Sequence, residues 1–524
     1  MTQRARYIAC LTAAALTFIA CGSRVVPLSS DAQGNPISGF DNVNPTGEPV
    51  PGATGSLAPG VDPTTGASVG PSVGPRAILP NCTPGTGDVG VTKDTIKLGL
   101  IASINGPLKG QFDSAVQAVD AYFKGLNEAG GICGRRIQLL IRDDQGNGAN
   151  NLAIAKKLVE EEKIFAFVGS HSAPDDSGIA KVSKEHKVPD LGFSLTWERA
   201  ENKYSYGVPG QVQREWIGEG ASGSKWLNEV NDIEQIAIFW LRESEVSILS
   251  AWGFEAAMIR TTNRERGKPI KICHEQPAGV VDTNYNNYVI AMKGNCDPAD
   301  GPIGVYTTME NNANINLARA MRQQQFGYKI FAPTFSSYLP TFISQANGAT
   351  EGAYIAMPQV PIERLEQPQS TWTPGTQELR RYLATLKRFY PNHKPTGSFG
   401  GPAWGSAALF TDAAAHCGAN LTRACVLNRL ETMPPFSAGG FLTPVAPGTH
   451  RIYTADLIVQ VRNGRFVEVR PSDKSGPAGG PDFWDTSELF NWQVLYCSTR
   501  ENTHADGSPW WPNRQAKDSL IDRC

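Results

Sequence analysis

Short apolar, β-branched runs alternate in this chain with segments whose apolar residues recur at helical spacing. In the first series the expected strands and helices lie, in order, at 95–102, 115–127, 136–141, 152–161, 164–168, 179–186 and 188–193. A short, continuously apolar run is typical of a strand that is buried on both faces of a sheet. Strands that alternate with amphipathic helices form βαβ units, so the pattern predicts a parallel sheet.

A second series of the same kind begins near Gln235. Its expected strands and helices lie at 236–240, 247–261, 270–273, 285–293, 302–306, 315–325 and 329–332. A turn-rich passage at 204–213 separates the two series, and a chain of 524 residues exceeds what one compact domain usually holds. The sequence therefore predicts an α/β protein with two doubly wound parallel-sheet lobes joined by a hinge.

Three further elements follow the second series. Residues 377–390 and 403–415 have helical patterns. Apolar runs at 457–461 and 465–469 flank Asn463-Gly464. An Asn-Gly pair favours a tight type I′ turn, so these two runs are expected to form a β-hairpin.

The N-terminus is typical of an export signal. Arg4 and Arg6 precede an apolar run, Tyr7 to Ala20, that is too short to cross a bilayer comfortably and suits a signal peptide. The run ends at Phe18-Ile-Ala-Cys21, which resembles a bacterial lipobox, with Phe18 where leucine is usual. The resemblance implies that residues 1–21 end in a lipidated Cys21. An ordinary secretory signal with an incidental cysteine is the alternative.

The two ends of the mature chain have a different composition from its middle. Gly, Pro, Ser, Thr and Asn dominate from Gly22 to about Asn81. Such a segment buries too little apolar surface to offset its ordering entropy, so 22–92 is expected to be a flexible tether. Residues 471–524 are rich in Gly, Pro and Trp, and we expect this tail to pack on a lobe.

Cysteine usage supports an exported protein. Of the ten cysteines, Cys10 lies in the signal and Cys21 is the expected anchor, which leaves eight. An even number in an exported chain favours disulfides, and eight cysteines allow 105 connectivities. Proximity along the chain predicts four bridges, Cys82–Cys133, Cys273–Cys296, Cys417–Cys425 and Cys497–Cys524. A metal site is the alternative, but no pair has C-x-x-C spacing, so we expect neither a metal nor a cofactor.

The charge balance excludes some partners. A formal net charge of −2 argues against a nucleic-acid-binding protein or a basic membrane-surface protein. Attachment to a membrane is therefore expected only through Cys21.

One family resembles this order of motifs. The region 94–469 contains IKLGLIASINGP, NEAGGICGRRIQLLIRDDQGN, AIAKKLVEEEKIFAFVGSHSAP, KVPDLGFSLT, EGAYIAMP and GGFLTPVAPGTHRIYTADLIVQVRNGRF in that order. The series resembles the branched-chain amino acid-binding (Leu/Ile/Val-type) periplasmic proteins, the type I solute-binding proteins of ABC importers. The resemblance implies a small-molecule ligand and permease subunits as partners. It also implies lobe 1 at 93–213 and 356–438, lobe 2 at 214–355 and 439–470, and crossings near 207–214, 354–359 and 439.

The ligand is expected where the sheets face each other. Ligands of doubly wound folds bind beyond the carboxyl ends of the strands. In this sequence those ends are 103–107, 169–174 and 194–197 in lobe 1, and 241–244, 307–310 and 334–337 in lobe 2.

The resemblance carries over to individual residues. Thr196 matches the threonine that holds the ligand's carboxylate in the family, and Ser194 lies beside it. Ala173 stands where a serine is usual, so Ser170, His171 or Ser172 would have to replace that donor. Thr334 stands where an acid would pair with the ligand's ammonium group, and Glu310 and Glu243 are nearby candidates. Trp197 and Tyr306 complete the predicted ligand-binding set. These departures point to a ligand other than a branched-chain amino acid, such as an amide, a urea-like compound or an aromatic acid.

Some of these residues could serve the fold and not the ligand. His171 could be a turn residue or an interlobe hydrogen-bonding residue, and Trp197 could serve packing alone. No G-x-S-x-G motif is present, and we expect no enzymatic activity. The sequence favours an extracytoplasmic, membrane-anchored lipoprotein that captures a small polar molecule for an ABC importer. A tethered sensor or receptor ectodomain of the same fold is the alternative, and a neighbouring permease gene would discriminate between them.

Overall fold

The structure is a computed structural model, and it describes residues 60–61, 68–69, 78–79, 81–85, 87–211, 232–267, 270–392, 397–453, 455–469 and 484–485. The expected signal peptide, the lipobox with Cys21, and the expected Cys497–Cys524 bridge lie outside these residues. So does the expected tail, except for Trp484 and Asp485. Among the helices within the described ranges, none is both long enough and apolar enough to span a bilayer.

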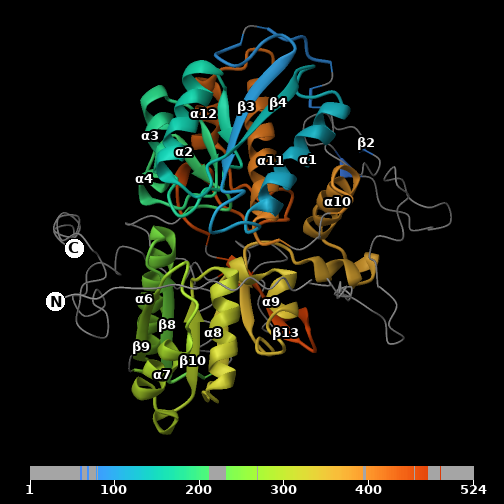
Figure 1. Ribbon diagram of the computed structural model, residues 1–524. Helices are drawn as coiled ribbons and strands as arrows, with labels where there is room; N and C mark the ends of the chain where they lie inside the picture. The colour runs from blue at the N-terminus through green and yellow to red at the C-terminus, as the bar shows by residue number, and fades with distance from the viewer. Residues whose placement is uncertain are drawn as a thin grey trace, which may run out of the picture. The chain divides into compact units, whose positions relative to one another are not determined.

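The first lobe is built on a five-stranded parallel sheet (Figure 1). Its strands, in the spatial order β4-β3-β5-β6-β7, are Arg136–Asp143, Thr95–Ala102, Ala166–Val168, Asp190–Gly192 and Ser205–Gly207. The helices that follow these strands are α1 (Asp113–Glu128), α2 (Gly148–Lys156, extended by a π-helical turn over Lys157–Glu161), α3 (Ser177–His186) and α4 (Trp197–Ala200). Three later helices complete the lobe, α10 (Pro374–Phe389), α11 (Gly400–Cys417) and α12 (Arg423–Thr432).

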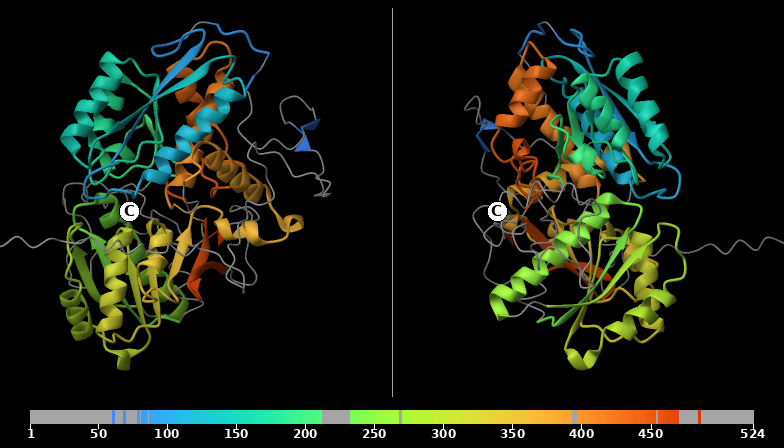
Figure 2. Two further views of the ribbon diagram at one scale, coloured as in Figure 1. Left: turned by 45° about the vertical axis from the view of Figure 1, so that its right-hand side comes forward. Right: turned by 90° about the vertical axis from the view of Figure 1, so that its left-hand side faces the viewer.

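Side chains of β3 alternate between the two helical layers of this lobe. Leu98 and Leu100 pack in the cluster that includes α1 and α11, whereas Ile101 packs with α2 and α3. The alternation follows from the two-residue period of a strand. Helix α11 is distant from α1 in the sequence, yet the two lie side by side in all views (Figures 1 and 2). Trp404 of α11 is fully buried, with its ring 4.6 Å from that of Tyr122 on α1.

The second lobe has a four-stranded parallel sheet. Its strands, in the spatial order β11-β10-β8-β9, are Ile330–Pro333, Ile303–Thr307, Gln235–Leu241 and Lys271–Ala278. Its helices are α6 (Glu245–Arg266), α7 (Asn286–Asn295), α8 (Asn311–Gln323) and the short α9 (Pro340–Ser344). Ile236 and Ile238 pack with α6, and Ala237 and Phe239 pack with α7 and α8, so this sheet is also covered on both faces.

An antiparallel sheet adjoins the second lobe. It comprises β12 (Tyr354–Met357), β13 (Ala455–Arg462) and β14 (Arg465–Val469), and β15 (Trp484–Asp485) pairs with β13. Asn463 and Gly464 have φ values of 52° and 72°. Positive φ at both central positions is the requirement of a type I′ turn, so the hairpin predicted from Asn-Gly is present.

The chain passes between the lobes in segments that hydrogen-bond to each other. Val360 donates its N–H to the Phe441 carbonyl at 2.9 Å, and Thr443 donates to Pro358 at 2.9 Å. Gln211 donates to the Arg451 carbonyl at 3.3 Å, which ties the first passage to the last. The family resemblance implies crossings near 207–214, 354–359 and 439, and Gln211, Pro358 and Phe441 lie at or near these positions.

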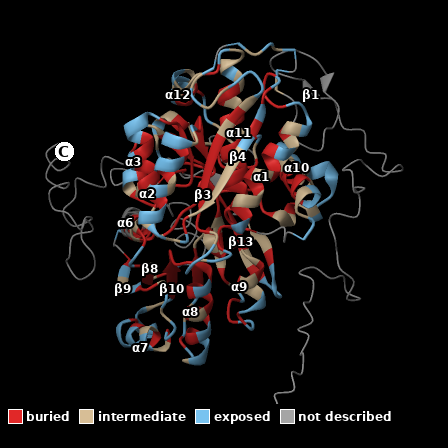
Figure 3. Cartoon of the chain, turned by 45° about the horizontal axis from the view of Figure 1, so that its top comes forward, coloured by how far each residue is buried: buried red, intermediate tan, exposed pale blue. Residues whose placement is uncertain are grey.

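Other short elements complete the described chain. Two strands of two residues, β1 (Gly60–Val61) and β2 (Ser68–Val69), pair antiparallel. The 3-10 turns are Pro298–Asp300, Phe335–Ser337, Ile362–Glu366, Gln369–Thr371 and Pro447–Thr449. Figure 3 shows buried residues concentrated on the central strands and on the helix faces that cover them.

Three of the four predicted disulfides are present, Cys82–Cys133, Cys273–Cys296 and Cys417–Cys425. The first of them joins Cys82, in the expected tether, to Cys133 in the first lobe, so the folded part begins earlier in the chain than expected. Ile78 donates to the Gly131 carbonyl at 2.9 Å and Gly85 donates to the Ala419 carbonyl at 3.0 Å. Among the described residues, Ile78 and Gly85 therefore contact the first lobe, although the sequence predicts a tether as far as residue 92.

Helix α8 also begins earlier than expected. Helical spacing of apolar residues predicts a start at Ile315, but the helix starts at Asn311. The Glu310 carboxylate accepts hydrogen bonds from the N–H groups of Asn312 and Ala313 at 2.7 and 2.5 Å. This cap lets the polar residues before Ile315 join the helix.

We expect the two disulfides of the first lobe to stabilise it unequally. Cys82–Cys133 spans 51 residues and Cys417–Cys425 spans 8. Loop-closure entropy predicts losses of about 4 and about 2.5 kcal/mol in the free energy of unfolding for the respective Cys→Ser pairs. Urea unfolding followed by circular dichroism measures both pairs under the same conditions. Equal losses would contradict an entropic origin of the stabilisation.

Candidate functional site

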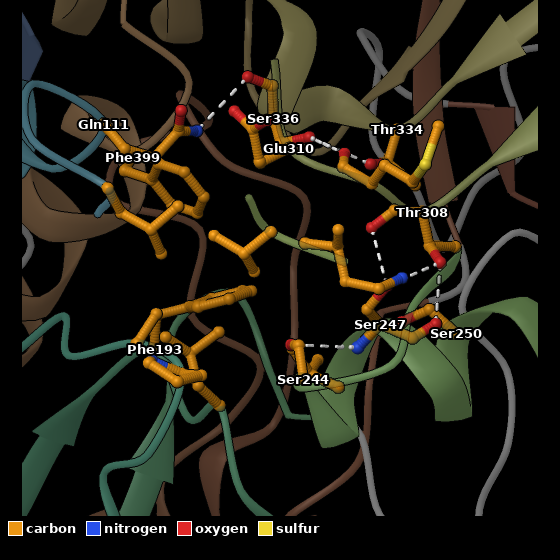
Figure 4. A pocket seen from close by; sticks show the side chains of 18 of the residues that line it. Gln111, Phe193, Ser244, Ser247, Ser250, Thr308, Glu310, Thr334, Ser336 and Phe399 are labelled. Atoms are coloured by element: carbon orange, nitrogen blue, oxygen red, sulfur yellow. Dashed lines mark hydrogen bonds between the residues drawn. The ribbon is translucent and has the colours of Figure 1, made fainter. Parts of the chain in front are cut away.

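A pocket of about 650 Å³, including its open mouth, lies where loops of the two lobes meet (Figure 4). Twelve of its twenty lining residues are apolar: Leu108, Phe112, Ala173, Pro174, Phe193, Leu195, Leu241, Val246, Val280, Met309, Phe335 and Phe399. The other eight are Gln111, Ser244, Ser247, Ser250, Thr308, Glu310, Thr334 and Ser336. The concave shape and the mostly apolar lining are typical of a site for a small molecule.

The strands position most of this lining. Ala173 and Phe193 follow β5 and β6 in the first lobe, and Thr308 and Thr334 directly follow β10 and β11 in the second. The carboxyl ends of both parallel sheets therefore contribute to one pocket, as expected for doubly wound sheets.

Aromatic rings form one wall of the pocket. Phe399 lies at the N-terminal end of α11, with its ring centroid 5.0 Å from Phe112 and 5.6 Å from Phe193. Phe335 of the second lobe approaches Phe399 at 5.3 Å and Phe193 at 5.8 Å. Tilted and edge-to-face rings at these distances attract each other, so the cluster joins the two lobes at the pocket.

Hydroxyl groups line the opposite side, as Figure 4 shows for Ser244, Ser247 and Thr308. The Ser247 hydroxyl donates to the Thr308 carbonyl at 2.9 Å and accepts from the Leu241 N–H at 2.8 Å. The Thr308 hydroxyl donates to the Ser247 carbonyl at 2.7 Å. Much of the polar capacity on this side therefore serves to hold α6 against the end of β10.

Glu310 is the one charged residue of the described lining. Both of its carboxylate oxygens cap helix α8, and burial raises the pKa of this carboxyl although the two backbone N–H groups oppose the shift. No lysine, arginine or histidine belongs to the described lining of this pocket.

A buried ion group supports the first-lobe wall. Arg199 is fully buried and contacts Asp176 at 2.9 Å and Asp190 at 2.8 Å. Burial alone would lower the pKa of Arg199, but the two carboxylates outweigh this and raise it. Arg199 also donates to the Phe193 carbonyl at 2.9 Å, and Asp176 accepts from the Leu195 N–H at 2.9 Å. The ion group thus fixes the backbone that carries two lining residues.

His171 lies behind the aromatic wall. Its ring stacks on Phe193 at 5.8 Å and contacts Phe399 at 5.5 Å. Burial lowers the pKa of His171 to about 4, so the ring is neutral at neutral pH. The Gly169 carbonyl, 3.0 Å from Nδ1, can only accept, which assigns the hydrogen to Nδ1. Within the described residues Nε2 has no hydrogen-bond partner.

The structure brings three of the sequence-predicted residues into the lining, Ala173, Glu310 and Thr334. It places five of the other first-lobe candidates, Ser170, His171, Ser172, Ser194 and Thr196, in the protein interior. Residues 170–172 continue the pairing of β5 along β3, where the Ser170 hydroxyl accepts from the Ile101 N–H at 3.1 Å and the Ser172 hydroxyl donates to the Ile101 carbonyl at 3.2 Å. The side chains of these three residues are therefore buried inside the first lobe and do not line the pocket.

Ser194 and Thr196 also make internal bonds. Ser194 donates to Gln211 Oε1 at 3.2 Å, and Thr196 donates to Asp176 Oδ1 at 2.5 Å. Neither residue belongs to the pocket lining. In this structure both hydroxyls hold loops in place.

The remaining predicted residues lie outside the lining as well. Tyr306 faces α6 and stacks on Phe254, with 3.4 Å between ring centroids, because it follows Val305 on a strand and so points to the opposite face. Glu243 is exposed, 3.7 Å from Arg242. The indole N–H of Trp197 donates to Glu198 at 3.0 Å.

Sequence reasoning missed the aromatic wall. Phe193 ends an expected strand, and Phe399 belongs to a Ser-Phe-Gly-Gly-Pro segment that has no phosphate-loop signature. Their proximity depends on α11, which the chain reaches only after crossing to the second lobe and back. Within the described ranges, no group of three or more His, Cys, Asp or Glu side chains is placed to hold a metal ion.

Comparisons with known proteins agree with this geometry. The model of the family described as "Periplasmic binding protein" matches residues 95–222 and 251–469. The leucine-binding protein LivK from Thermotoga maritima is 15% identical, with a TM-score of 0.58 over 75% of this chain and 100% of that one. A branched-chain amino acid ABC transporter protein from Thermus thermophilus, solved with bound valine, is 18% identical, with a TM-score of 0.59 over 74% and 98%.

A third solved structure is named for a different solute. The fatty acid ABC transporter substrate-binding protein from Thermomonospora curvata is 19% identical, with a TM-score of 0.58 over 76% of this chain and 98% of that one. At these identities the likeness shows the fold alone. A search of curated proteins finds no significant match.

Two hydrogen bonds join the lobes beside the pocket. Glu245, the first residue of α6, accepts the Trp197 N–H at 3.0 Å, and Val246 donates to the Leu195 carbonyl at 3.4 Å. Burial raises the pKa of Glu245 to about 7, and Glu198, Asp176 and Asp175 add to the rise, whereas the Trp197 N–H opposes it.

This arrangement predicts a pH dependence of lobe closure. A carboxyl group whose pKa is higher in the closed form than in the open form takes up a proton when the lobes close. This contribution to closure is fully present below the ordinary pKa of the carboxyl group, and it is progressively lost as the pH rises through about 7. Fluorescence energy transfer between dyes on the two lobes should therefore report more closed protein at pH 5 than at pH 8. The Glu245→Gln variant should lose this dependence, and a variant with the wild-type profile would contradict the prediction.

Proposed function

Because the chain belongs to the periplasmic binding protein family, we propose that it captures a small molecule between its lobes and delivers it to an ABC importer. The proteins of this family bind solutes and are not enzymes, and the family implies an extracytoplasmic location. The observation that carries the proposal is the pocket at the facing strand ends, to which both lobes contribute side chains.

The chain passages between the lobes support a clamp that opens and closes. Three passages are held together by main-chain bonds at Val360, Thr443 and Gln211, so bending is confined to a narrow region. Few bonds join the lobes at the pocket itself, among them the two at Glu245 and Val246. Closure around a ligand by a hinge is an established motion of such folds.

Delivery to an importer is supported by the similar structures. Two of them are described as ABC transporter proteins and one as a leucine-binding protein. We propose that permease subunits receive the solute and that the protein is held at the membrane by a lipid on Cys21, after removal of residues 1–20. The low-complexity segment after Cys21 would give the lobes reach from the membrane.

Ligand binding should depend on the aromatic wall. Phe335→Ala removes a ring that contacts Phe193 and Phe399, and losing the burial of one phenylalanine against the ligand should weaken binding about 10- to 100-fold. Native mass spectrometry identifies the small molecule that co-purifies with the protein, and isothermal titration calorimetry then measures its affinity. The control is Ile290→Ala on α7, a side chain that is 56% exposed and lies outside the pocket. Equal affinities of the two variants would remove the pocket from the proposed function.

The lipid anchor has its own test. Cys21→Ser should abolish incorporation of radiolabelled palmitate and release the protein from the membrane fraction into the soluble fraction. Cys10→Ser, which lies inside the expected signal, is the matched control and should leave lipidation intact. Lipidation that persists in Cys21→Ser would contradict the anchor.

A further inference from the structure

We propose that the pocket takes an uncharged molecule with an apolar body and amide or hydroxyl groups, and that it rejects carboxylates and free amino acids. This inference rests on the proposed function, because it names the ligand class of the same site. Four features of the described lining carry it.

The first feature is the apolar body of the pocket. Phe193, Phe335 and Phe399 form a continuous aromatic surface, and Leu108, Val246 and Val280 add aliphatic surface around it. Enclosed apolar surface contributes to affinity in proportion to the ligand area that it removes from water, so these side chains favour a ligand whose body is apolar.

The second feature is the absence of a cation in the described lining. No lysine or arginine lines the pocket, and the nearby Arg199 is fully buried between Asp176 and Asp190. Two carboxylates for one guanidinium leave this group with no positive charge to offer a ligand. A ligand carboxylate enclosed here would lose its hydration without gaining an ionic partner from the described lining, which is costly.

The third feature is that a side chain of the protein already caps the N-terminus of α8. The N-terminus of a helix that points into a ligand pocket is a ready place for an anion, because its first N–H groups have no partner inside the helix. Glu310 already occupies the N–H groups of Asn312 and Ala313. A ligand carboxylate would be repelled by Glu310, and a ligand ammonium would find a carboxylate whose charge the helix terminus already compensates.

The fourth feature is a pair of uncharged polar side chains, Ser244 and Gln111, on different sides of the described lining (Figure 4). Ser244 Oγ accepts from the Ser247 N–H at 3.4 Å and, among the described contacts, donates to no partner. Gln111 makes a long 3.5 Å bond from its amide nitrogen to the Ser336 carbonyl. A hydroxyl donor and a side-chain amide match a ligand amide or hydroxyl group, because each can donate and accept without a net charge.

The test compares three end groups on the same apolar body. 4-Phenylbutanamide, 4-phenylbutanoate and 4-phenylbutylamine are titrated into the protein after removal of bound solute, together with leucine, and octanamide and octanoate repeat the comparison without the ring. Each amide should bind at least about tenfold more tightly than its carboxylate, and 4-phenylbutanamide should exceed 4-phenylbutylamine by as much. Tighter binding of leucine, a carboxylate or the amine would overturn the inference.

A variant of Glu310 tests its part in this selectivity. Glu310→Gln removes the negative charge but keeps an oxygen to cap α8, so the carboxylates should gain affinity and the amide-to-carboxylate ratio should fall about tenfold. The matched control is Asp297→Asn, which changes an acidic cap on the same lobe, outside the pocket, where Asp297 accepts from the Ala299 N–H at 2.9 Å. Thermal melting should show that both variants are folded. An unchanged amide-to-carboxylate ratio in Glu310→Gln would then show that Glu310 does not determine this selectivity.

Failure of the inference is distinguishable from failure of the proposed function. If neither amide binds with a dissociation constant below about 1 mM, the ligand class is wrong. Native mass spectrometry of the protein as purified then tests whether the protein binds a solute at all. A co-purifying charged solute whose binding Phe335→Ala weakens would retain the proposed function, whereas a protein that carries and binds no solute would lose both.

Discussion

Parallel pairing in two separate sheets is the constraint on which the rest of this structure depends. Strands that run in the same direction end at the same edge, so the loops after β5, β6, β10 and β11 collect at two edges. In this chain the two edges face one pocket, and half of its lining comes from those four loops. The other half comes from the segments that follow β3 and β9, from the end of β8 with the start of α6, and from the start of α11. The covering helices bury both faces of each sheet and leave the strand ends as the place for a ligand.

The pocket is shaped by residues that do not line it. The Arg199 group holds the carbonyl of Phe193 and, through Asp176, the N–H of Leu195. Burying these charges carries a desolvation cost that the close contacts and hydrogen bonds offset, so the value of the group lies in the single loop conformation that it imposes. Ser194 and Thr196 serve the same loop through Gln211 and Asp176. The two hydroxyls therefore hold the loop that carries Phe193, and they do not line the pocket themselves.

Much of the fold could be predicted from the sequence because it follows from local patterns. The apolar runs and helical spacings located most strands and helices of both lobes, and Asn463-Gly464 located the hairpin turn. They did not locate α4, α9 or α12, and β7 lies within the passage that was expected to be turns. The start of α8 was misjudged because it depends on Glu310, and a glutamate cap has no strong local signature. Tyr306 was expected at the ligand, but the period of the strand directs it to α6.

The sequence by itself determined the α/β class, the two lobes, three described disulfide pairings and the edge at which a ligand would lie. These properties depend on periodicity, on cysteine positions and on the direction of the strands, all of which can be inferred from short segments of the sequence. Only the tertiary structure decided which side chains form the pocket. Phe112, Phe193, Phe335 and Phe399 meet across long stretches of sequence, and whether a hydroxyl faces a ligand or a neighbouring loop depends on packing that no local pattern records.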